Sequence, residues 1–364
     1  TGMLTTKEAG DYNLGLKSNG YFRMQLDGKN VTSSYGGDPN EAKLGRVHLE
    51  AGKPAALTVE FSSLAGGAPS AQLVWSKVDL SPQPAAVEAA KKADVVIAVV
   101  GITSELEGEE MQVSEPGFLG GDRTSIDLPK PEEDLLQTLA GAHKPLVVVL
   151  TNGSALAVNW ANEHANAILD SWYAGEEGGT AVAETLSGRN NPAGRLPVTF
   201  YTGVEQLPHF EDYSMRNRTY RYFTGKPLYP FGYGLSYTTF SYSDLALPTE
   251  PVKAGDPVMA SVTVTNSGKV AGDEVVQLYL GFPDVMGAPL KAMRAFKRVH
   301  LDPGASQKVE FTLKDRDLGM VTELGNPIIA EGKYKVSIGG GQPDSGAPAV
   351  AGTFSINQTV SLPD

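Results

Sequence analysis

Hydrophobic and polar residues alternate along residues 1–80, and short turn sequences interrupt the alternation. Two of the alternating stretches are Tyr21–Leu26 and Ala56–Phe61, and the pair Asp27-Gly28 directly follows the first of them. An Asp-Gly pair flanked by alternating residues is typical of a two-residue β-hairpin. The pattern therefore predicts an all-β domain over residues 1–80, built as a β-sandwich or barrel.

Residues 84–240 follow a different pattern, in which short and uniformly apolar runs are separated by helix-like segments. The expected strands cover residues 94–101, 145–151 and 167–173, and the expected helices cover residues 84–92, 131–142 and 179–186. Uniformly apolar strands that alternate with helices are typical of a parallel sheet covered on both faces. We therefore expect an α/β sandwich domain with a mostly parallel sheet over residues 84–240.

The alternation returns in the last part of the chain. The alternating stretches are residues 257–266, 274–280, 290–299, 307–313 and 332–339. Strands at this spacing, with turn residues between them, are typical of an immunoglobulin-like or fibronectin-like β-sandwich. A third domain is expected over residues 241–364, and 364 residues are enough for about two to four domains.

Composition excludes several functional classes. The formal net charge is −12 and the chain has no long basic run, which argues against a nucleic-acid partner. The chain has no Cys, so disulfides, thiol nucleophiles and thiolate metal sites are excluded, and its five His include no pair with metal-binding helical spacing. Apolar runs are much shorter than the roughly 18 residues of a membrane span. We expect no metal, no cofactor, no nucleic acid and no membrane partner.

A long acidic loop follows the expected strand 94–101. In open α/β sheets, ligands bind beyond the carboxyl ends of the strands, and a loop of this length is often functional. A carboxyl group crowded by like charges can keep its proton near neutral pH and act as a general acid. The alternative is a solvated acidic loop with no role in catalysis. The glutamates of this loop are Glu105, Glu107, Glu109, Glu110 and Glu115.

Two other charged groups lie near the same side of the expected sheet. Glu176 and Glu177 precede the helix expected at residues 179–186, where carboxylates complement the helix dipole, so capping is their simplest role. Asp122 and Arg123 follow the acidic loop. An Arg side chain binds carboxylates with good geometry, so an ion pair or a loop anchor is the simplest interpretation, and contact with a substrate is the alternative.

Longer motifs in the second half of the chain resemble those of a known enzyme family. They begin with Trp172-Tyr-Ala-Gly-Glu-Glu-Gly-Gly-Thr-Ala and continue at residues 186–200, 218–223 and 229–240. Together they resemble the C-terminal half of glycoside hydrolase family 3, the β-glucosidase and β-xylosidase family. The last 120 or so residues resemble the fibronectin type III-like domain of that family, and residues 1–80 resemble part of a PA14 module.

The resemblance implies a general acid/base for the acidic loop. The family pattern is a Glu before Gly, then a loop, then Asp-Arg and a Leu-x-Leu-Pro stretch. Glu107-Gly108, Asp122-Arg123 and Ile126–Pro129 match it, with Ile in place of the first Leu. Glu107 is therefore the implied acid/base, with Glu105 and Glu109 as competitors. Asp122 and Arg123 are implied as candidates for substrate binding.

The resemblance also implies a retaining mechanism, in which an Asp nucleophile and the acid/base lie roughly 5–5.5 Å apart. That nucleophile would belong to a TIM-like barrel of about 250 residues, which the sequence lacks. We therefore expect these residues to be the C-terminal portion of a longer polypeptide, or half of a split enzyme, and to be inactive alone. The substrate would be a β-linked oligosaccharide or aryl glycoside.

Terminal β-glucosyl residues are the first expectation for the substrate, and β-xylosyl residues are the second. Enzymes of this kind act outside the cytoplasm, so a secreted or periplasmic location is implied. The alternative function is a non-catalytic, barrel-free protein that binds carbohydrate. In that case Trp75, Trp160 or Trp172 could stack on sugar rings, although Trp more often belongs to a core.

Overall fold

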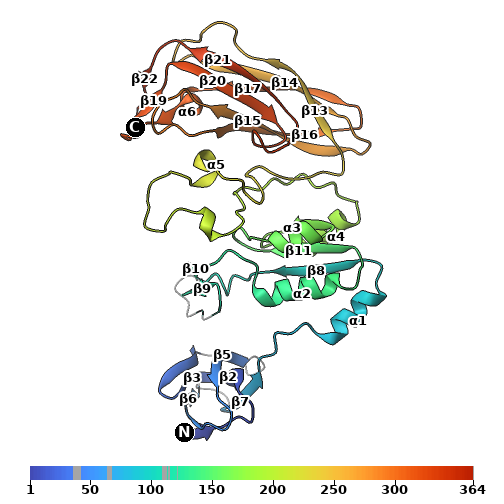
Figure 1. Cartoon of the computed structure of the whole chain (residues 1–364), viewed down its shortest axis with the longest axis vertical. Coiled ribbons are helices and arrows are strands. Elements are labelled where there is room, and N and C mark those ends of the chain that lie inside the picture. Colours follow the sequence, from blue (N-terminus) through green and yellow to red (C-terminus); the bar gives the residue numbers. More distant parts are fainter. Residues whose placement is uncertain (36–41, 64–67, 109–112, 114, 121, 364) are drawn as a thin grey trace. The chain divides into compact units, whose positions relative to one another are not determined.

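The computed structural model describes residues 1–35, 42–63, 68–108, 113, 115–120 and 122–363. It divides into two compact units, Thr1–Pro84 and Ala85–Asp364 (Figure 1).

The first unit is all-β, as the alternating pattern predicts. Its strands form two antiparallel sheets, with the orders β1-β6-β3-β4 and β5-β2-β7. The β3–β4 hairpin turns at Asp27 and Gly28, whose φ angles of 48° and 76° are the positive values that a type I′ turn requires. Inward-facing side chains, among them Leu14 and Met24, form its core. The strands are β1 (Gly2–Leu4), β2 (Gly10–Ser18), β3 (Gly20–Leu26), β4 (Lys29–Tyr35), β5 (Ala42–Leu49), β6 (Ala55–Ser63) and β7 (Ala71–Lys77).

The second unit begins with an α/β part. Its sheet has the order β12-β11-β8 and both pairs of strands are parallel, which confirms the predicted parallel sheet. Strand β12 ends three residues earlier than predicted, because Trp172 adopts a left-handed φ of 53° and the chain leaves the sheet there. The elements are α1 (Pro84–Lys92), β8 (Val96–Gly101), α2 (Lys130–Ala140), β11 (Leu146–Thr151), α3 (Asn159–His164), β12 (Ala167–Asp170) and α4 (Gly178–Leu186).

Among the described residues, strand β8 is buried on one face only. Alternate side chains such as Val96 and Ala98 pack in one core with Leu136 of α2 and its neighbours. The side chains between them point the other way, and Ile97 and Val99 are 54% and 63% exposed. The prediction of a sheet covered on both faces is therefore wrong for β8. A uniformly apolar strand predicts burial of both faces, but nothing in the described part of the chain covers the second one.

The stretch between the acidic loop and α2 forms no regular strand. Residues 124–129 form a single parallel bridge, between Asp127 and Ala157. A small antiparallel hairpin precedes them, made of β9 (Phe118–Leu119) and β10 (Asp122–Arg123). Pro129 then ends the extended segment, since it lacks the N–H that a ladder needs and stands before the first turn of α2.

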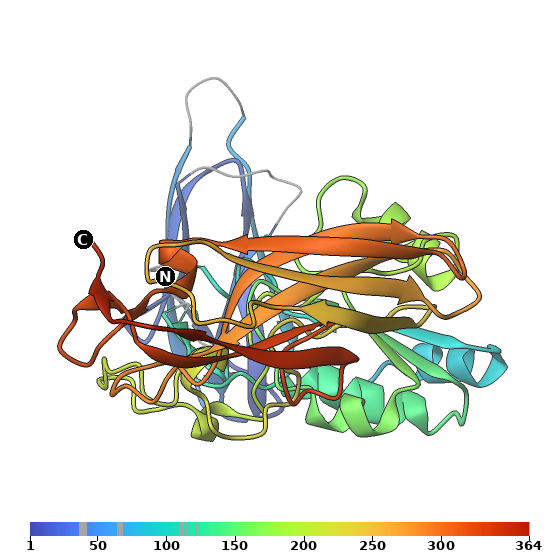
Figure 2. The same cartoon turned by 90° about the horizontal axis from the view of Figure 1, so that it is seen from above.

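The end of the chain is a sandwich of two antiparallel sheets, with the orders β13-β14-β17 and β16-β15-β20-β21 (Figure 2). The inward side chains, Val262 and Leu278 among them, form one large core. Before the sandwich lie a 3-10 turn (Val204–Gln206) and α5 (Thr219–Tyr222), and a small third sheet is built from segments just before β20 and just after β21. The elements are β13 (Phe240–Ala246), β14 (Val258–Asn266), β15 (Gly272–Gly281), β16 (Ala292–Leu301), β17 (Ser306–Leu313), α6 (Asp315–Leu318), β18 (Met320–Val321), β19 (Pro327–Ile329), β20 (Gly332–Gly339), β21 (Ala349–Ile356) and β22 (Val360–Ser361).

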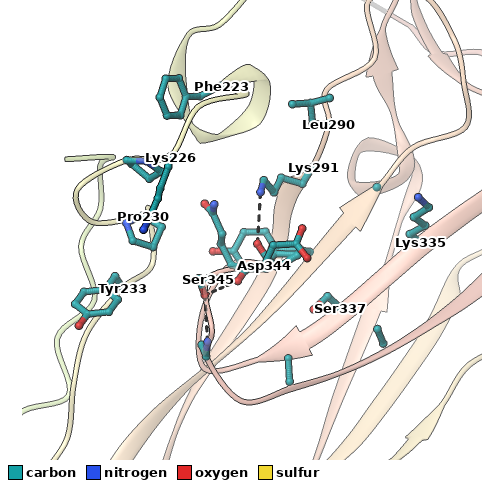
Figure 3. Close-up of a pocket in the computed structure, with 18 of the residues that line it drawn as sticks. Phe223, Lys226, Pro230, Tyr233, Leu290, Lys291, Lys335, Ser337, Asp344 and Ser345 are labelled. Atoms are coloured by element: carbon teal, nitrogen blue, oxygen red, sulfur yellow. Dashed lines mark hydrogen bonds between the residues drawn. The ribbon is translucent and has the colours of Figure 1, made fainter. Parts of the chain in front are cut away.

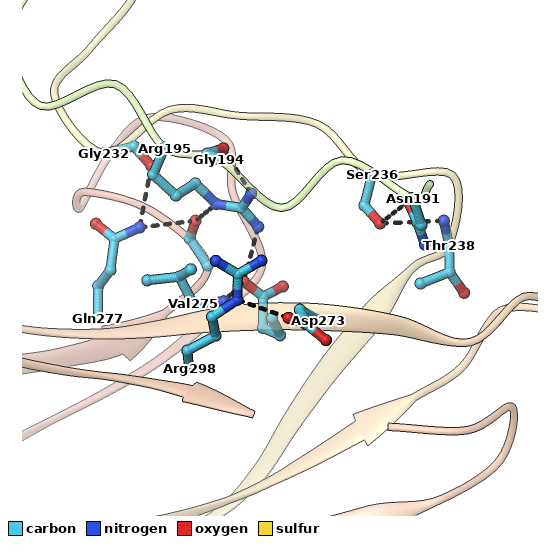
Figure 4. A network of polar contacts seen from close by, with 12 residues as sticks. Asn191, Gly194, Arg195, Gly232, Ser236, Thr238, Asp273, Val275, Gln277 and Arg298 are labelled. Carbon is cyan, nitrogen blue, oxygen red and sulfur yellow. Dashed lines mark hydrogen bonds and ion pairs between the residues drawn. The ribbon is translucent and has the colours of Figure 1, made fainter. Parts of the chain in front are cut away.

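A buried polar network joins this sandwich to the segment that follows α4 (Figure 4). The Arg195 guanidinium donates to Glu274 Oε1 at 2.8 Å and to the carbonyl of Gly340 at 3.3 Å. Gln277 Nε2 donates to the same Gly340 carbonyl and to that of Gly232. The Arg195 and Glu274 side chains are only 9% and 5% exposed. Burial raises the pKa of Glu274, and the charge of Arg195 opposes that rise.

Candidate active site

Three loops meet beyond the carboxyl ends of the parallel strands. The register pairs Gly101 with Thr151 and Leu150 with Asp170, so β8, β11 and β12 all end at one edge of the sheet. Each loop contributes a polar side chain to the same place. These side chains are Glu107 after β8, Ser154 after β11 and Tyr173 after β12.

The Glu107 carboxylate is at the centre of this cluster. Ser154 Oγ donates a short hydrogen bond to Oε1, and Tyr173 Oη donates to Oε2 at 2.7 Å. The side chain is 18% exposed, so the carboxylate is mostly enclosed but still accessible to solvent on one side. A carboxylate has roughly four lone-pair positions, and these two hydrogen bonds leave one position free on each oxygen.

Arg123 brings a positive charge to the same carboxylate. Its Nη1 lies 3.7 Å from Glu107 Oε1 and donates to Ser154 Oγ at 3.0 Å. Its Nε donates to the carbonyl of Ser125 at 2.9 Å, and the guanidinium lies over the Phe118 ring, 5.3 Å from the centroid. Burial lowers the pKa of Arg123, and the charge of Glu107 opposes that change. Arg123 therefore forms an ion pair and also anchors the loop, as the simplest interpretation of Asp122-Arg123 predicts.

Tyr173 approaches Glu107 closely because residue 153 has no side chain. A Cβ at Gly153 would lie 2.6 Å from Tyr173 Cε2 and 2.9 Å from Glu107 Oε2, both too close for ordinary contact. Burial, and then the hydrogen bond to Glu107, raise the pKa of Tyr173 well above its usual range. The phenol therefore stays protonated and remains a donor to the carboxylate at any physiological pH.

A partly buried Asp and a fully buried Asn support the two donors. Asp170 Oδ1 accepts a hydrogen bond from the backbone N–H of Trp172 at 3.1 Å, next to Tyr173. Asn152 is fully buried, and its Nδ2 donates to the carbonyl of Ser154 at 2.9 Å. Burial raises the pKa of Asp170, although the Trp172 hydrogen bond opposes the rise. Both donors to Glu107 are thus held by polar side chains at the ends of β11 and β12.

The other predicted site residues do not join the cluster. The Asp122 and Glu105 side chains are exposed, and no side-chain hydrogen bond or ion pair of either is found in the described ranges. Glu109 and Glu110 lie outside the described residues. Glu177 is the N-cap residue of α4 but makes no side-chain cap hydrogen bond, so the predicted capping role is wrong in that respect. Both Glu176 and Glu177 face solvent and retain only their proximity to the helix dipole.

The three Trp residues occupy different environments. Trp160 packs against the α/β core and stacks on His164, and Trp172 contacts Phe200 edge-on. Trp75, in the first unit, is 46% exposed on β7 and stacks on Tyr12. Trp75 alone of the three thus offers a large exposed surface, and it does so on a strand.

Neither a metal cluster nor a membrane helix is found in the described ranges. No group of three or more His, Cys, Asp or Glu side chains there is arranged to hold a metal ion. No described helix is both long and apolar enough to cross a bilayer.

Comparison with known proteins gives two family matches. The family described as glycosyl hydrolase family 3 C-terminal domain matches residues 13–237, and the fibronectin type III-like domain matches residues 274–342. The xylan 1,4-beta-xylosidase of Xylanibacter ruminicola is 38% identical and aligns with 92% of this chain and 39% of its own length. The periplasmic beta-glucosidase of Salmonella typhimurium is 40% identical, over 70% of this chain and 34% of its own length.

Solved structures agree with these matches. A beta-glucosidase from Kluyveromyces marxianus in complex with glucose superposes with a TM-score of 0.69 and 28% identity, over 99% of this chain and 44% of that one. Beta-glucosidase 3B from Thermotoga neapolitana, in complex with alpha-D-glucose, has a TM-score of 0.65 and 30% identity over 77% of this chain and 40% of that one. The chain therefore spans less than half the length of the relatives described here.

Proposed function

The chain belongs to glycosyl hydrolase family 3, and from this membership we propose that it is the C-terminal part of a retaining exo-β-glycosidase in which Glu107 is the general acid/base. One observation carries the proposal: three loops at the carboxyl edge of the parallel sheet fix the Glu107 carboxylate with Tyr173 and Ser154. Glu105, its competitor in the same loop, lacks any such contact in the described ranges.

The hydrogen bonds of Glu107 suit a residue that first gives and then takes a proton. As acid, Glu107 would protonate the leaving oxygen, using the free lone-pair position on one carboxyl oxygen. The carboxylate that forms would then accept fully from Tyr173 and Ser154, so these bonds strengthen as the transition state is reached. In the second step Glu107 would take a proton from water, which attacks the glycosyl-enzyme. Arg123 would hold the charged form in place between the two steps.

The second carboxyl group would come from a TIM-like barrel on the same polypeptide or on a second one. Relatives that extend well beyond the matched region support this. The exposed apolar face of β8, formed by Ile97 and Val99, is a surface that further protein would cover. Arg123 and the adjacent residue of β10, Asp122, would bind substrate at the junction with that barrel.

Terminal non-reducing β-glucosyl residues of oligosaccharides are the proposed substrate, with β-xylosyl residues as the second candidate. The beta-glucosidase relatives support the first, and the xylosidase that aligns with 92% of the chain supports the second. A secreted or periplasmic location is proposed from the periplasmic relative. The two antiparallel sheets of the first unit support a partial PA14-like module there.

The first experiment is the intact mass of the polypeptide that carries this sequence, under denaturing and native conditions, with turnover of 4-nitrophenyl β-glucoside and β-xyloside. We expect barrel-sized additional protein and measurable turnover, and the ratio of the two kcat/KM values decides the sugar. A lone 38.5 kDa species that binds sugar without turnover would overturn the enzyme proposal and favour the carbohydrate-binding alternative.

Glu107→Ala then tests the assigned residue, with Glu105→Ala as its matched control from the same loop. General acid catalysis contributes about 10²- to 10⁴-fold, so Glu107→Ala should lose that much kcat/KM on a methyl glycoside. It should lose far less on a 2,4-dinitrophenyl glycoside, whose leaving group needs no proton, and azide should restore turnover as a β-glycosyl azide. The same behaviour in Glu105→Ala instead would show that Glu107 is the wrong residue.

A further inference from the structure

A groove of about 1330 Å³ lies within the second unit, far along the chain from the acidic loop (Figure 3). One wall is the segment that follows α5, residues 223–230, together with Tyr233. The other wall is formed by β20, the start of β21 and the turn between them, including residues 342–345. The groove is large enough to hold several sugar units or a molecule of similar size.

The charge of the groove is opposite to that of the chain. Lys226, Lys291 and Lys335 line it, and Asp344 is the single acidic residue among its lining residues. The chain as a whole has a net charge of −12. None of the three amines forms an ion pair with any residue that the structure describes. The groove therefore offers three unpaired positive charges to an anionic ligand.

Lys291 is the most enclosed of these amines. Its Nζ donates to the carbonyl of Pro343 at 3.4 Å, so the side chain reaches across to the turn (Figure 3). Burial lowers the pKa of Lys291, and the charge of Asp344 opposes the change. A partly buried ammonium without a carboxylate partner is unfavourable, and an incoming anion would relieve that cost.

Aromatic rings form part of the same groove. Tyr229 and Tyr233 are stacked, with centroids 5.4 Å apart and an interplanar angle of 19°. Tyr229 Oη donates to Asn162 Oδ1 at 2.7 Å, which fixes the ring. Rings with apolar faces suit a ligand that itself has apolar faces and a polar rim, as a pyranose does. A small inorganic anion would use the amines but not these rings.

We propose that this groove binds an acidic oligosaccharide, whose carboxylates pair with Lys226, Lys291 and Lys335. Its sugar rings pack against Tyr229 and Tyr233, and its hydroxyl groups donate to Asp344. The site is separate from Glu107 and uses no residue of the proposed catalytic cluster. It would attach the protein to uronate-bearing polysaccharide whether or not the hydrolase proposal is correct.

The test is calorimetric titration of the full-length polypeptide with tetragalacturonate, and with cellotetraose and sulfate as comparison ligands. We expect saturable binding of tetragalacturonate that weakens as ionic strength rises, and no comparable binding of cellotetraose or sulfate. The double variant Lys226→Gln/Lys335→Gln should weaken binding by about two- to fivefold for each amine removed. Lys333→Gln is the matched control, because Lys333 lies two residues from Lys335 on β20, is also exposed and does not line the groove.

Three results would overturn the proposal. The first is no binding of tetragalacturonate by the full-length polypeptide. The second is sulfate binding as tight as that of tetragalacturonate, which would mean a simple anion site. The third is equal affinity in the double variant and the Lys333→Gln control, provided that thermal melts show all three proteins folded. None of these readouts depends on turnover, so failure of the hydrolase proposal would be seen separately.

Discussion

Replacing Gly153 with Ala should lower the activity that depends on the Glu107 carboxyl, although Gly153 has no side chain that contacts this group. The new Cβ would lie 2.6 Å from Tyr173 Cε2, where ordinary contact begins near 3.4 Å. Tyr173 is 44% exposed and can move outward, so the ring should retreat by roughly 1 Å rather than strain the core. The 2.7 Å bond from Tyr173 to Glu107 would then stretch beyond hydrogen-bonding distance.

The size of the effect follows from that one bond. A hydrogen bond to a charged group is worth about 1.5–3 kcal/mol. If it stabilises mainly the carboxylate that forms in the transition state, kcat/KM should fall by about 10- to 150-fold. The assay is kcat/KM of the full-length polypeptide on a methyl β-glucoside, where acid catalysis matters most, with the melting temperature measured in parallel.

Companion variants decide whether the bond is the cause. Tyr173→Phe should lose a similar amount, and the double variant Gly153→Ala/Tyr173→Phe should lose little more than either single one. Gly175→Ala, where a Cβ meets nothing within 4 Å, is the matched control and should keep full activity. Additive losses in the double variant, or full activity in Gly153→Ala, would refute the reasoning.

Two further predictions concern stability. Arg195→Met leaves the buried Glu274 carboxylate unpaired and should lower the free energy of unfolding by about 3–5 kcal/mol. The double variant Arg195→Met/Glu274→Leu removes that carboxylate and should recover most of the lost free energy. Urea unfolding measures both variants, and an equal loss of unfolding free energy in the two would contradict the ion-pair argument. Burial raises the pKa of Glu132, and the hydrogen bond that the Gly101 N–H donates to it opposes the rise. The native state therefore keeps the proton to a higher pH than the unfolded state does. The free energy of unfolding should fall as pH rises from the ordinary carboxyl pKa through the raised one. Glu132→Gln should remove the part of this decrease that Glu132 causes, as urea unfolding at several pH values would show. An unchanged pH dependence of the unfolding free energy would contradict the assignment to Glu132.

Strands with strong local patterns could be predicted from the sequence, and elements defined by distant contacts could not. The run of β11 is recognisable because it is almost wholly apolar, and four of its six residues are buried while the other two are partly buried. Strand β21 was not predicted, because Ala349–Ile356 contains small residues and a Gly and gains its place by pairing with β20.

The site was predicted only in part, for a similar reason. Glu107 and Arg123 belong to motifs that can be matched in sequence, and the structure brings them together. Ser154 and Tyr173 were missed as members of the cluster, because their role depends on how three parallel strands are aligned. One signal was available: both lie within a few residues of a strand's carboxyl end, where α/β sheets place their ligands.

The buried Arg195 network affects how such proteins can be rearranged. Gly340, in the hairpin turn of the sandwich, accepts from both Arg195 and Gln277, and Arg195 lies in the segment after α4. Cutting the chain before Phe240 would leave the guanidinium exposed and its two acceptors missing, so the α/β part should not persist unchanged without the sandwich. A chimera that exchanges only one of these parts would have to exchange residues 195, 274 and 277 as a set. We therefore expect the α/β part and the sandwich to be exchanged between proteins together, as a single module.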